Sequence, residues 1–436
     1  PQVTTSIFTE MSLFCYEIRV NFMQAAGIIA EYNPLHSGHT GLMARIRRRL
    51  GPETAIVCAM SGNFVQRGDF ALIRKHVRAE AAVRGGADLV LELPLPWAVS
   101  SAERFASGGV QVLSAAGVVT HLAFGSECGD AGALMELAAC LNSPDYHAEL
   151  RRRLSSGRSF AVCRRQAAEA LAGPERAALL DSPNNNLGVE YCRAILNQNA
   201  SLRPLAFLRE GAAHDSGEPR PGSAGAVRRL VREGRRADAL SLMAPAMALL
   251  YQSEEAAGRA PVLAETCQRA VLARLRSMEE AEFAALDQGR EGLYRRLYAA
   301  SRSAASVEEL LELAKTRRYA HARLRRMVLW AYLGLRPAEF PAAVPYLRVL
   351  AANGRGRALL AAMRRSALLP VLTKPAGAGL LSPDARRVFG LEARGTDLYT
   401  LAYPELRASV PGGEWRTGPV MLPESGRQHS ADDTVL

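Results

Sequence analysis

The first part of the chain alternates between short apolar runs and longer segments in which apolar residues recur every three or four positions. Short apolar runs predict buried strands, and helical spacing predicts amphipathic helices. The pattern predicts helices over 39–50, 75–84 and 102–116, set between strands over 26–30, 55–59, 88–92 and 121–124. Such alternation is typical of an α/β fold, in which helices cover a parallel sheet. The carboxyl ends of the strands then share one edge, where ligands bind.

The pattern changes in the middle of the chain. Residues 131–200 are predicted to be helical, with a break at Ser182-Pro183-Asn184-Asn185-Asn186. The stretch 217–225, rich in Gly and Pro, predicts a loop or boundary. Helical spacing then continues over 226–340, which predicts a helical domain.

Both ends of the chain have their own character. A short α/β piece is predicted over 341–409, and the polar, Gly- and Pro-rich stretch 410–436 predicts a disordered tail. Residues 1–22 lack the apolar core and cleavage site of a secretory signal, and the first predicted strand follows Met23. We interpret residues 1–22 as a disordered extension and expect the first domain to span 23–216.

Composition adds limits to this picture. The chain has 436 residues, room for two or three domains, and is 48% hydrophobic and 22% charged, as globular proteins are. It contains no uninterrupted apolar stretch of about 18 residues, so we expect no membrane span. The formal net charge of +11 makes a polyanionic partner plausible, although an Arg-rich codon bias explains it equally well. Seven cysteines without a C-x-x-C pair favour reduced thiols in a cytoplasmic protein.

One segment carries recognisable chemistry. The first strand leads into EYNPLHSGH, in which His36-Ser37-Gly38-His39 opens a predicted helix. A glycine between two histidines lets a phosphate approach the backbone, where the helix N-terminus offers free N–H groups. Histidine donors can stabilise the charge that develops when the α-phosphorus of a nucleotide is attacked. The pattern therefore indicates adenylyl transfer, with His36 and His39 as catalytic residues; the alternative is a turn with two exposed histidines.

Six motifs in order resemble one known family. They are EYNPLHSGH, MSGNFVQRGDFA (60–71), DLVLELP (88–94), FGSE (124–127), PNNNLGVEY (183–191) and KTRRYAHARLRRM (315–327). Together they resemble the bacterial tRNA(Met) cytidine acetate ligases of the HIGH-type nucleotidyltransferase superfamily. The resemblance runs from about Met23 to Lys374.

The resemblance implies a function and a fold. Such a ligase activates acetate with ATP as acetyl-adenylate and transfers the acetyl group to N4 of the wobble cytidine of elongator tRNA(Met), releasing AMP and diphosphate. It implies a Rossmann-like nucleotidyltransferase domain over 23–216 and a tRNA-binding role for the helical domain over 226–340. ATP, accompanied by Mg²⁺, acetate and tRNA are the implied partners, in the cytoplasm. A small-molecule nucleotidyltransferase and a non-catalytic nucleotide- and RNA-binding protein remain as alternatives.

The resemblance also implies site residues. Its ATP-binding stretch falls on Ile29, Ala30, Glu31, Tyr32, Asn33, Pro34, Leu35, His36, Ser37, Gly38, His39, Thr40, Gly41 and Leu42. Single ATP contacts fall on Gly125, Asn184 and Arg209. A glycine lets a nucleotide lie close, an amide can pair with hydroxyls or base edges, and a guanidinium can neutralise phosphate.

A basic segment of the helical domain is the candidate RNA surface. Phosphate contact is favoured over a solvated helix face because the cations are dense. They are Lys315, Arg317, Arg318, Arg323, Arg325 and Arg326.

A few polar residues elsewhere stay open. Arg67 could hold phosphate or a substrate carboxylate, or be a solvated loop residue. Asp88 and Glu92 could position magnesium or cap neighbouring elements, and we expect no protein metal site because further ligands are not evident. Ser61 and Asn63 follow a strand and are plausible polar contacts.

Overall fold

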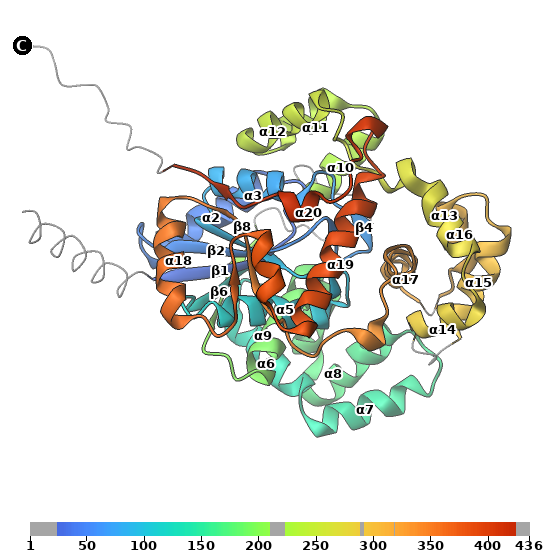
Figure 1. Ribbon diagram of the computed structural model, residues 1–436. Helices are drawn as coiled ribbons and strands as arrows, with labels where there is room; N and C mark the ends of the chain where they lie inside the picture. The colour runs from blue at the N-terminus through green and yellow to red at the C-terminus, as the bar shows by residue number, and fades with distance from the viewer. Residues whose placement is uncertain (1–23, 210–222, 288–291, 318, 424–436) are drawn as a thin grey trace, which may run out of the picture.

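Five parallel strands form the centre of the sheet in the computed structural model, which describes residues 24–209, 223–287, 292–317 and 319–423. Their spatial order is β5-β2-β1-β6-β7. The neighbouring strands β2, β1 and β6 are labelled in Figure 1. The bounds are β1 Ala25–Ala30, β2 Ala55–Ser61, β5 Leu89–Leu93, β6 His121–Ser126 and β7 Arg203–Leu208. The predicted α/β fold with a parallel sheet is confirmed. The predicted extension over 1–22 lies outside the described residues.

Chain order reverses next to β1. β2 and β5 follow on one side of this strand, and β6 and β7 lie on the other. In open α/β sheets, ligands bind at the carboxyl ends of the strands where the order reverses. The histidine segment directly follows β1, so it lies at this position.

Alternate residues of the central strands enter two separate cores. Ile29 and Val57 pack on one face of the sheet, whereas Ile28 and Cys58 pack on the other. Strands buried on both faces read as continuous apolar runs, which is why the sequence located them. The first face is covered by α5 (Ala102–Ala115), α6 (Ala131–Leu141) and α9 (Pro183–Asn197), and the second by α2 (Ser37–Leu50) and α3 (Lys75–Arg84).

Shorter elements complete this part of the molecule. α7 and α8 pack against each other and α8 against α6, and α4 precedes α5. The predicted break at 182–186 is confined to Ser182, because Pro183 takes the first position of α9, where its missing N–H costs nothing. The bounds are α4 Leu95–Ala98, α7 Pro144–Leu154, α8 Phe160–Ala178 and η1 Leu179–Asp181.

The C-terminal α/β piece extends the main sheet. β8 (Leu347–Ala352) runs antiparallel to β5, and β9 (Val371–Leu372) and β10 (Val420–Met421) pair with β8. The expected disorder from 410 onward is wrong for the residues up to 423. The sequence hid this because the ordering comes from distant contacts: β10 joins the sheet, and Glu414 is buried. The helices here are α18 (Gly354–Ser366), η4 (Pro375–Leu380), α19 (Pro383–Thr400), η5 (Leu406–Ala408) and α20 (Gly413–Arg416).

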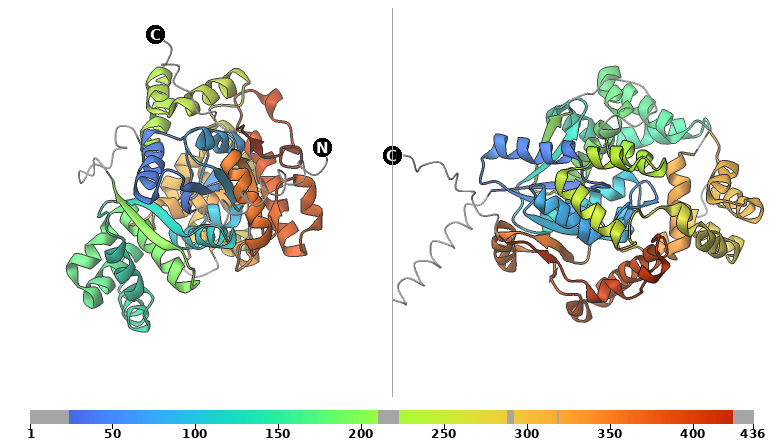
Figure 2. Two further views of the ribbon diagram at one scale, coloured as in Figure 1. Left: turned by 90° about the vertical axis from the view of Figure 1, so that its left-hand side faces the viewer. Right: turned by 90° about the horizontal axis from the view of Figure 1, so that it is seen from above.

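The predicted helical stretch packs in two places. α10 (Ala224–Arg232), α11 (Arg236–Leu242) and α12 (Pro245–Ala256) add Val227 and Met247 to the core above α2 and α3. The later helices build a separate core, at the end of the molecule opposite to α18 (Figures 1 and 2). They are η2 (Ala264–Cys267), α13 (Gln268–Arg276), α14 (Glu280–Asp287), α15 (Leu293–Ser303), α16 (Val307–Ala314), α17 (His321–Leu333) and η3 (Pro337–Glu339).

A small hairpin connects this helical core to the sheet. β3 (Phe64–Val65) pairs antiparallel with β4 (Asp69–Phe70) in the loop between β2 and α3. Phe64 and Phe70 are buried in the core of the later helices, and Phe70 lies 6.0 Å from Tyr332 of α17, measured between ring centroids. The loop after β2 therefore belongs to both parts of the molecule.

Candidate functional site

The turn between β1 and α2 is held from neighbouring segments. Tyr32 has a left-handed backbone, with φ 46°, and its buried hydroxyl lies 3.4 Å from the Sγ atom of Cys58 on β2. The Oδ1 atom of Asn33 accepts a hydrogen bond of 2.7 Å from the backbone N–H of Leu72. These contacts fix the backbone that carries the two histidines.

Arg78 joins the ends of β1 and β2. Its guanidinium is completely buried and donates to the backbone carbonyls of Glu31, Ser61 and Gly62. Burial lowers its pKa to about 10, so it stays charged at neutral pH. A buried cation bound by carbonyl oxygens aligns the carboxyl ends of the two strands.

His36 and His39 cap α2 together. The backbone N–H of Gly38 donates to His36 Nδ1 at 3.1 Å, and the backbone N–H of His36 donates to His39 Nδ1 at 3.3 Å. An acceptor nitrogen carries no proton, so each neutral ring is protonated on Nε2. The two ring centroids lie 3.8 Å apart. Glycine is needed at position 38, because a Cβ atom there would lie 2.9 Å from His36 Cε1.

Both imidazoles are neutral at physiological pH. Burial lowers the pKa of His36 to about 4, and the charge of Arg209 adds to this effect. Burial also lowers the pKa of His39 well below its usual value, with smaller contributions from His36 and Arg209. His36 is only 7% exposed, which excludes the alternative of two exposed histidines. Two Nε2–H donors at a helix N-terminus suit phosphoryl oxygens.

Gly125, Asn184 and Arg209 meet one another beside the histidines. A Cβ atom on Gly125 would lie 3.2 Å from Arg209 Cγ, and Arg209 Nη1 donates to Asn184 Oδ1 at 3.5 Å. The effect of Arg209 on both histidine pKa values places its charge near the two rings. The structure thus brings the predicted residues together from the ends of β1, β6 and β7 and the start of α9.

Glu127 fixes Asn184, a role that the sequence analysis did not assign. Its carboxylate accepts hydrogen bonds from the backbone N–H groups of Asn184 and Asn185, at 3.3 and 2.7 Å, and from Asn184 Nδ2 at 2.6 Å. A carboxylate is favourable at a helix N-terminus. Because Nδ2 is held by Glu127, the Oδ1 atom of Asn184 is turned toward Arg209. The FGSE motif could have indicated this role, because its last residue, Glu127, directly follows β6.

The predicted stretch from Ile29 to Leu42 contains both core and surface side chains. The side chains of Ile29 and Leu35 are buried in the two cores, so they anchor the turn to the interior of the protein. Ser37 and Gly38 are exposed, and the Thr40 hydroxyl donates to the Ser37 carbonyl at 3.0 Å. The surface of the turn is therefore formed by Ser37 and Gly38 and by the partly exposed His39 and Thr40, whereas His36 is buried.

Arg228 is a second residue that the sequence analysis missed. It lies on α10, nearly two hundred positions from the histidines, and its Nη1 atom donates to the Asn33 carbonyl at 2.6 Å. Burial lowers its pKa, while the nearby carboxylates of Glu31 and Asp69 act in the opposite direction. Within the described residues it makes no ion pair. A half-buried cation beside the histidine turn is a candidate phosphate ligand, and only the folded chain reveals it.

Asp88 and Glu92 both serve the fold. Asp88 lies just before β5, where its carboxylate accepts from the Ile56 backbone at 2.8 Å and pairs with Arg47 at 2.7 Å. Glu92 pairs with Lys75 at 2.6 Å. Asp88 thus agrees with the capping interpretation given above, whereas Glu92 forms an ion pair that the sequence analysis did not consider. Among the described residues, no group of three or more His, Cys, Asp or Glu side chains could hold a metal ion.

Lys75 is the centre of a buried ionic cluster. Its ammonium lies 2.6 Å from Glu92 and 2.7 Å from Glu414, and Arg348 also pairs with Glu414. Burial alone would lower the pKa of Lys75, but Glu414 and Glu92 together raise it. Burial and the charge of Glu92 raise the pKa of Glu392, the fifth member of the cluster, well above its usual value. The cluster binds the C-terminal α20 to the start of α3.

Asn63 and Arg67 differ in exposure. The Oδ1 atom of Asn63 accepts from the Lys75 backbone at 2.9 Å and its Nδ2 donates to Thr396 at 3.1 Å, so this amide is used within the fold. Arg67 is exposed at the tip of the β3–β4 hairpin, and its charge contributes to lowering the pKa of Arg228.

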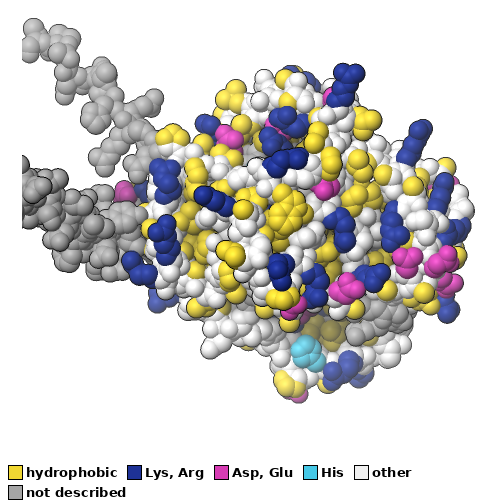
Figure 3. All heavy atoms as spheres, in the orientation of Figure 1, with side chains coloured by type: hydrophobic (Ala, Val, Ile, Leu, Met, Phe, Trp, Pro, Cys, Tyr) yellow, Lys and Arg dark blue, Asp and Glu magenta, His cyan; other side chains and the backbone are white. Residues whose placement is uncertain are grey.

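The basic segment does not form one uniform surface. Lys315, Arg317 and Arg325 are exposed, whereas Arg323 packs over the ring of Tyr319, with the guanidinium 5.3 Å from the ring centroid. Arg326 is half-buried, and burial lowers its pKa to about 10. Arg318 lies outside the described residues. On the face drawn in Figure 3, basic side chains are scattered, with acidic side chains among them.

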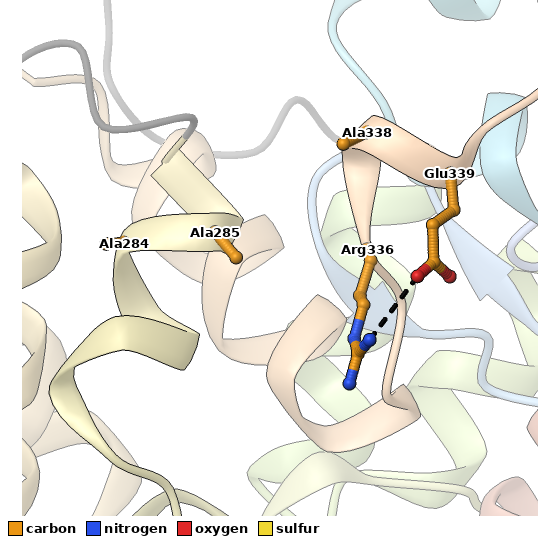
Figure 4. A pocket seen from close by; sticks show the side chains of 5 residues that line it. All are labelled: Ala284, Ala285, Arg336, Ala338 and Glu339. Carbon is orange, nitrogen blue, oxygen red and sulfur yellow. Dashed lines mark hydrogen bonds and ion pairs between the residues drawn. The ribbon is translucent and has the colours of Figure 1, made fainter.

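A hollow of about 510 Å³ lies elsewhere, on the helical region (Figure 4). It is lined by Ala284 and Ala285 of α14 and by Arg336, Ala338 and Glu339 around η3. Arg336 and Glu339 pair with each other at 3.4 Å. Three alanines and one internal ion pair offer no catalytic group, so the candidate site stays at the sheet edge.

Two further expectations concern the whole molecule. No helix among the described residues is long and apolar enough to cross a membrane. The six cysteines within the described ranges are all free thiols.

Comparison with known proteins identifies similar chains. The profile of the HIGH Nucleotidyl Transferase family matches residues 23–410. A tRNA(Met) cytidine acetate ligase of Syntrophomonas wolfei is 34% identical over 418 residues, which cover 91% of this chain and 99% of the relative. The enzyme of the same name from Syntrophotalea carbinolica is 38% identical over 368 residues, covering 80% of this chain and 85% of the relative.

Two solved structures are also similar to this chain. The crystal structure of Thermotoga maritima TmcAL bound with alpha-thio ATP is 30% identical in sequence and superimposes with a TM-score of 0.85. Its apo form superimposes with a TM-score of 0.87. Each comparison covers 92% of this chain and 100% of the other.

Proposed function

Because the chain belongs to the HIGH nucleotidyl transferase family and, within it, to the tRNA(Met) cytidine acetate ligases, we propose that it activates acetate with ATP and acetylates tRNA(Met). The resemblance seen in the six sequence motifs is thereby confirmed, and the protein is an enzyme of the ligase class. The observation that carries the proposal is the pair of neutral histidines at the switch point of the sheet, with Arg209 and Asn184 beside them.

The first half-reaction follows from this geometry. An acetate oxygen attacks the α-phosphorus of ATP, the bond to the β-phosphate oxygen breaks, and diphosphate leaves. The Nε2–H groups of His36 and His39 donate to the phosphoryl oxygens, where negative charge grows in the transition state. We assign phosphate contact also to Arg209 and Arg228, and close approach of the nucleotide to the backbone of Gly125, which has no side chain.

Magnesium enters this proposal as part of the nucleotide. Mg²⁺ commonly keeps several waters and binds through substrate phosphates with few protein carboxylates. The described residues offer no cluster of carboxylates around the histidines. We therefore propose that Mg²⁺ arrives bound to the phosphates of ATP.

The second half-reaction needs RNA at the same edge. The exocyclic amine of the wobble cytidine attacks the acetyl carbonyl carbon, AMP leaves, and the amine loses a proton. We propose that the exposed cations Lys315, Arg317 and Arg325 contact tRNA phosphates while the reaction proceeds at the sheet edge. The histidine-bearing region 23–216, together with Arg228 of α10, would thus house adenylation, and the later part of the helical region 226–340 would hold part of the tRNA. Because its proposed substrate is tRNA, we propose that the enzyme acts in the cytoplasm.

The test is a direct assay of the product. The protein is incubated with ATP, labelled acetate and bulk tRNA, and the tRNA is digested to nucleosides. Labelled N4-acetylcytidine that requires ATP is the expected result. ATP consumption without any dependence on acetate, or with acetate but no labelled nucleoside, would contradict the proposal.

A further inference from the structure

The turn at the tip of the β3–β4 hairpin is fastened to the catalytic edge of the sheet. The backbone N–H of Gln66 donates to the Glu31 carboxylate at 2.8 Å, and its side-chain amide donates to the Ser100 carbonyl at 3.3 Å. Glu31 follows the last residue of β1 and precedes Tyr32, whose ring packs edge-on against His39 with centroids 5.0 Å apart. The position of this turn is therefore linked to that of the histidines by a short chain of contacts.

Helix α17 holds the opposite side of the same turn. Arg326 Nη1 donates to the Gln66 carbonyl at 3.2 Å. Gly68 has a left-handed backbone, φ 77°, and a Cβ atom at this position would lie 2.5 Å from the backbone nitrogen of Arg326. The turn is thus wedged between the end of β1 and the backbone of α17.

Arg326 has a different environment from the neighbouring arginine. It is half-buried, and burial, followed by the charge of Arg323, lowers its pKa to about 10, so that it remains a cation at neutral pH. Within the described residues it makes no ion pair, and its hydrogen bond goes to the Gln66 carbonyl. Arg325, one position earlier, is exposed. A cation facing a carbonyl in a desolvated position strengthens that hydrogen bond.

We propose that Arg326 is a positioning residue for adenylation: it holds Gln66 against Glu31 and thereby sets the turn that carries His36 and His39. This inference rests on the proposed function. It removes Arg326 from the set of RNA-contacting cations and gives the helical region a part in building the ATP site. A small displacement of catalytic groups can lower a rate about a hundredfold, because the reacting atoms must be aligned.

The experiment compares Arg326 with Arg364, an exposed arginine of α18, in the full chain. Acetate-dependent exchange of labelled pyrophosphate into ATP, without tRNA, is measured for Arg326→Ala, Arg326→Lys and Arg364→Ala. We expect Arg326→Ala to lower kcat for exchange about tenfold or more, with a smaller change in KM for ATP, because the phosphate ligands stay in place. Arg326→Lys keeps a charged donor and should restore most of the rate. Arg364→Ala should exchange at the unmodified rate.

A second variant acts on the other side of the contact. Gly68→Ala leaves Arg326 unchanged but places a methyl group against the backbone of α17 in a left-handed conformation. It should lower kcat for exchange in the same way, with tRNA affinity and its salt dependence unchanged. A similar loss of kcat for exchange in Gly68→Ala and Arg326→Ala would support the proposed role of the contact between the hairpin turn and α17.

Measuring tRNA binding across a salt series separates this inference from the alternative that Arg326 contacts tRNA phosphates. Normal exchange by Arg326→Ala, together with a salt slope reduced by about one unit, would make Arg326 an RNA contact and overturn the inference. A loss of exchange in Arg326→Lys as large as in Arg326→Ala would also overturn it. Absence of acetate-dependent exchange in the unmodified chain would instead refute the proposed function.

Discussion

The histidine turn and the basic segment both stood out in the sequence as charged or polar clusters. The residues of the turn share one role, whereas the cations of the basic segment have different environments. In the turn, the decisive contacts join residues two or three positions apart, such as Gly38 with His36 and His36 with His39. In the basic segment, each cation meets a different neighbour: Arg325 faces solvent and Arg326 faces Gln66, 260 positions away. The role of a motif whose contacts are local can be predicted from its sequence. The role of each residue on a charged helix face depends on which other segments pack against it.

The largest expected effect concerns Lys75, a basic residue whose burial is complete. Replacing Lys75 by Met should destabilise the protein by about 3–5 kcal/mol. The buried carboxylates of Glu92 and Glu414 would lose the ammonium that pairs with both, and only Arg348 would remain as their cation. Urea unfolding measures the change. Exposed Lys374→Met is the matched control, with an expected change within about 0.5 kcal/mol. Equal stability of both variants would contradict the argument that a buried lysine contributes more to the free energy of unfolding than an exposed one.

The histidine turn should give the next largest effect. His36→Ala and His39→Ala each remove an Nε2–H donor to the developing charge, and each should lower the rate of acetyl-adenylate formation about 100- to 1000-fold. Single-turnover quench experiments with labelled acetate measure this rate. Exposed His147→Ala serves as the control and should react at the unmodified rate. Full activity of both site variants would refute the assigned chemistry.

The exposed part of the basic segment should give a smaller effect, limited to RNA. Combined replacement of Lys315, Arg317 and Arg325 by Ala should weaken tRNA binding and reduce the salt slope by about two to three units, roughly 0.7–0.9 per lost phosphate contact. Filter binding across a salt series measures both quantities. Arg364→Ala, an exposed arginine of α18, is the single-charge control. An unchanged slope would leave these cations as a solvated helix face.

The smallest effect is an expected absence of titration. Because burial lowers the pKa of His36 to about 4, its ring should remain neutral from pH 8 down to about pH 5. The stability linked to this neutral ring is present above the unfolded pKa of 6.5 and is lost as the pH falls toward 4. NMR titration of the histidine rings in the nucleotide-free protein checks this. A midpoint near 6.5 for His36 would contradict the buried, capped geometry.

The sequence predicted the parts of the fold that depend on local pattern. Continuous apolar runs located β1, β2, β5 and β6 because these strands are buried on both faces. β7 was missed, since it is an edge strand whose residues are mostly half-exposed and include Pro204.

The remaining misses have a common physical cause. Glu414 lies in a Gly- and Pro-rich stretch that predicts disorder, but its order comes from Lys75, 339 positions away. Arg228 reaches Asn33 across 195 positions, and Arg326 reaches Gln66 across 260. Single-sequence patterns contain no information about such pairs, so the centre of the candidate site was predictable and its supports were not.

The most direct measurement places the two regions side by side in one assay. Acetate-dependent exchange of labelled pyrophosphate into ATP, without tRNA, is compared among the unmodified chain, His39→Ala and the Lys315/Arg317/Arg325→Ala variant. The account predicts that His39→Ala loses about 100- to 1000-fold in rate while the triple variant exchanges as fast as the unmodified chain. Exchange that survives in His39→Ala, or that collapses in the triple variant, would contradict it.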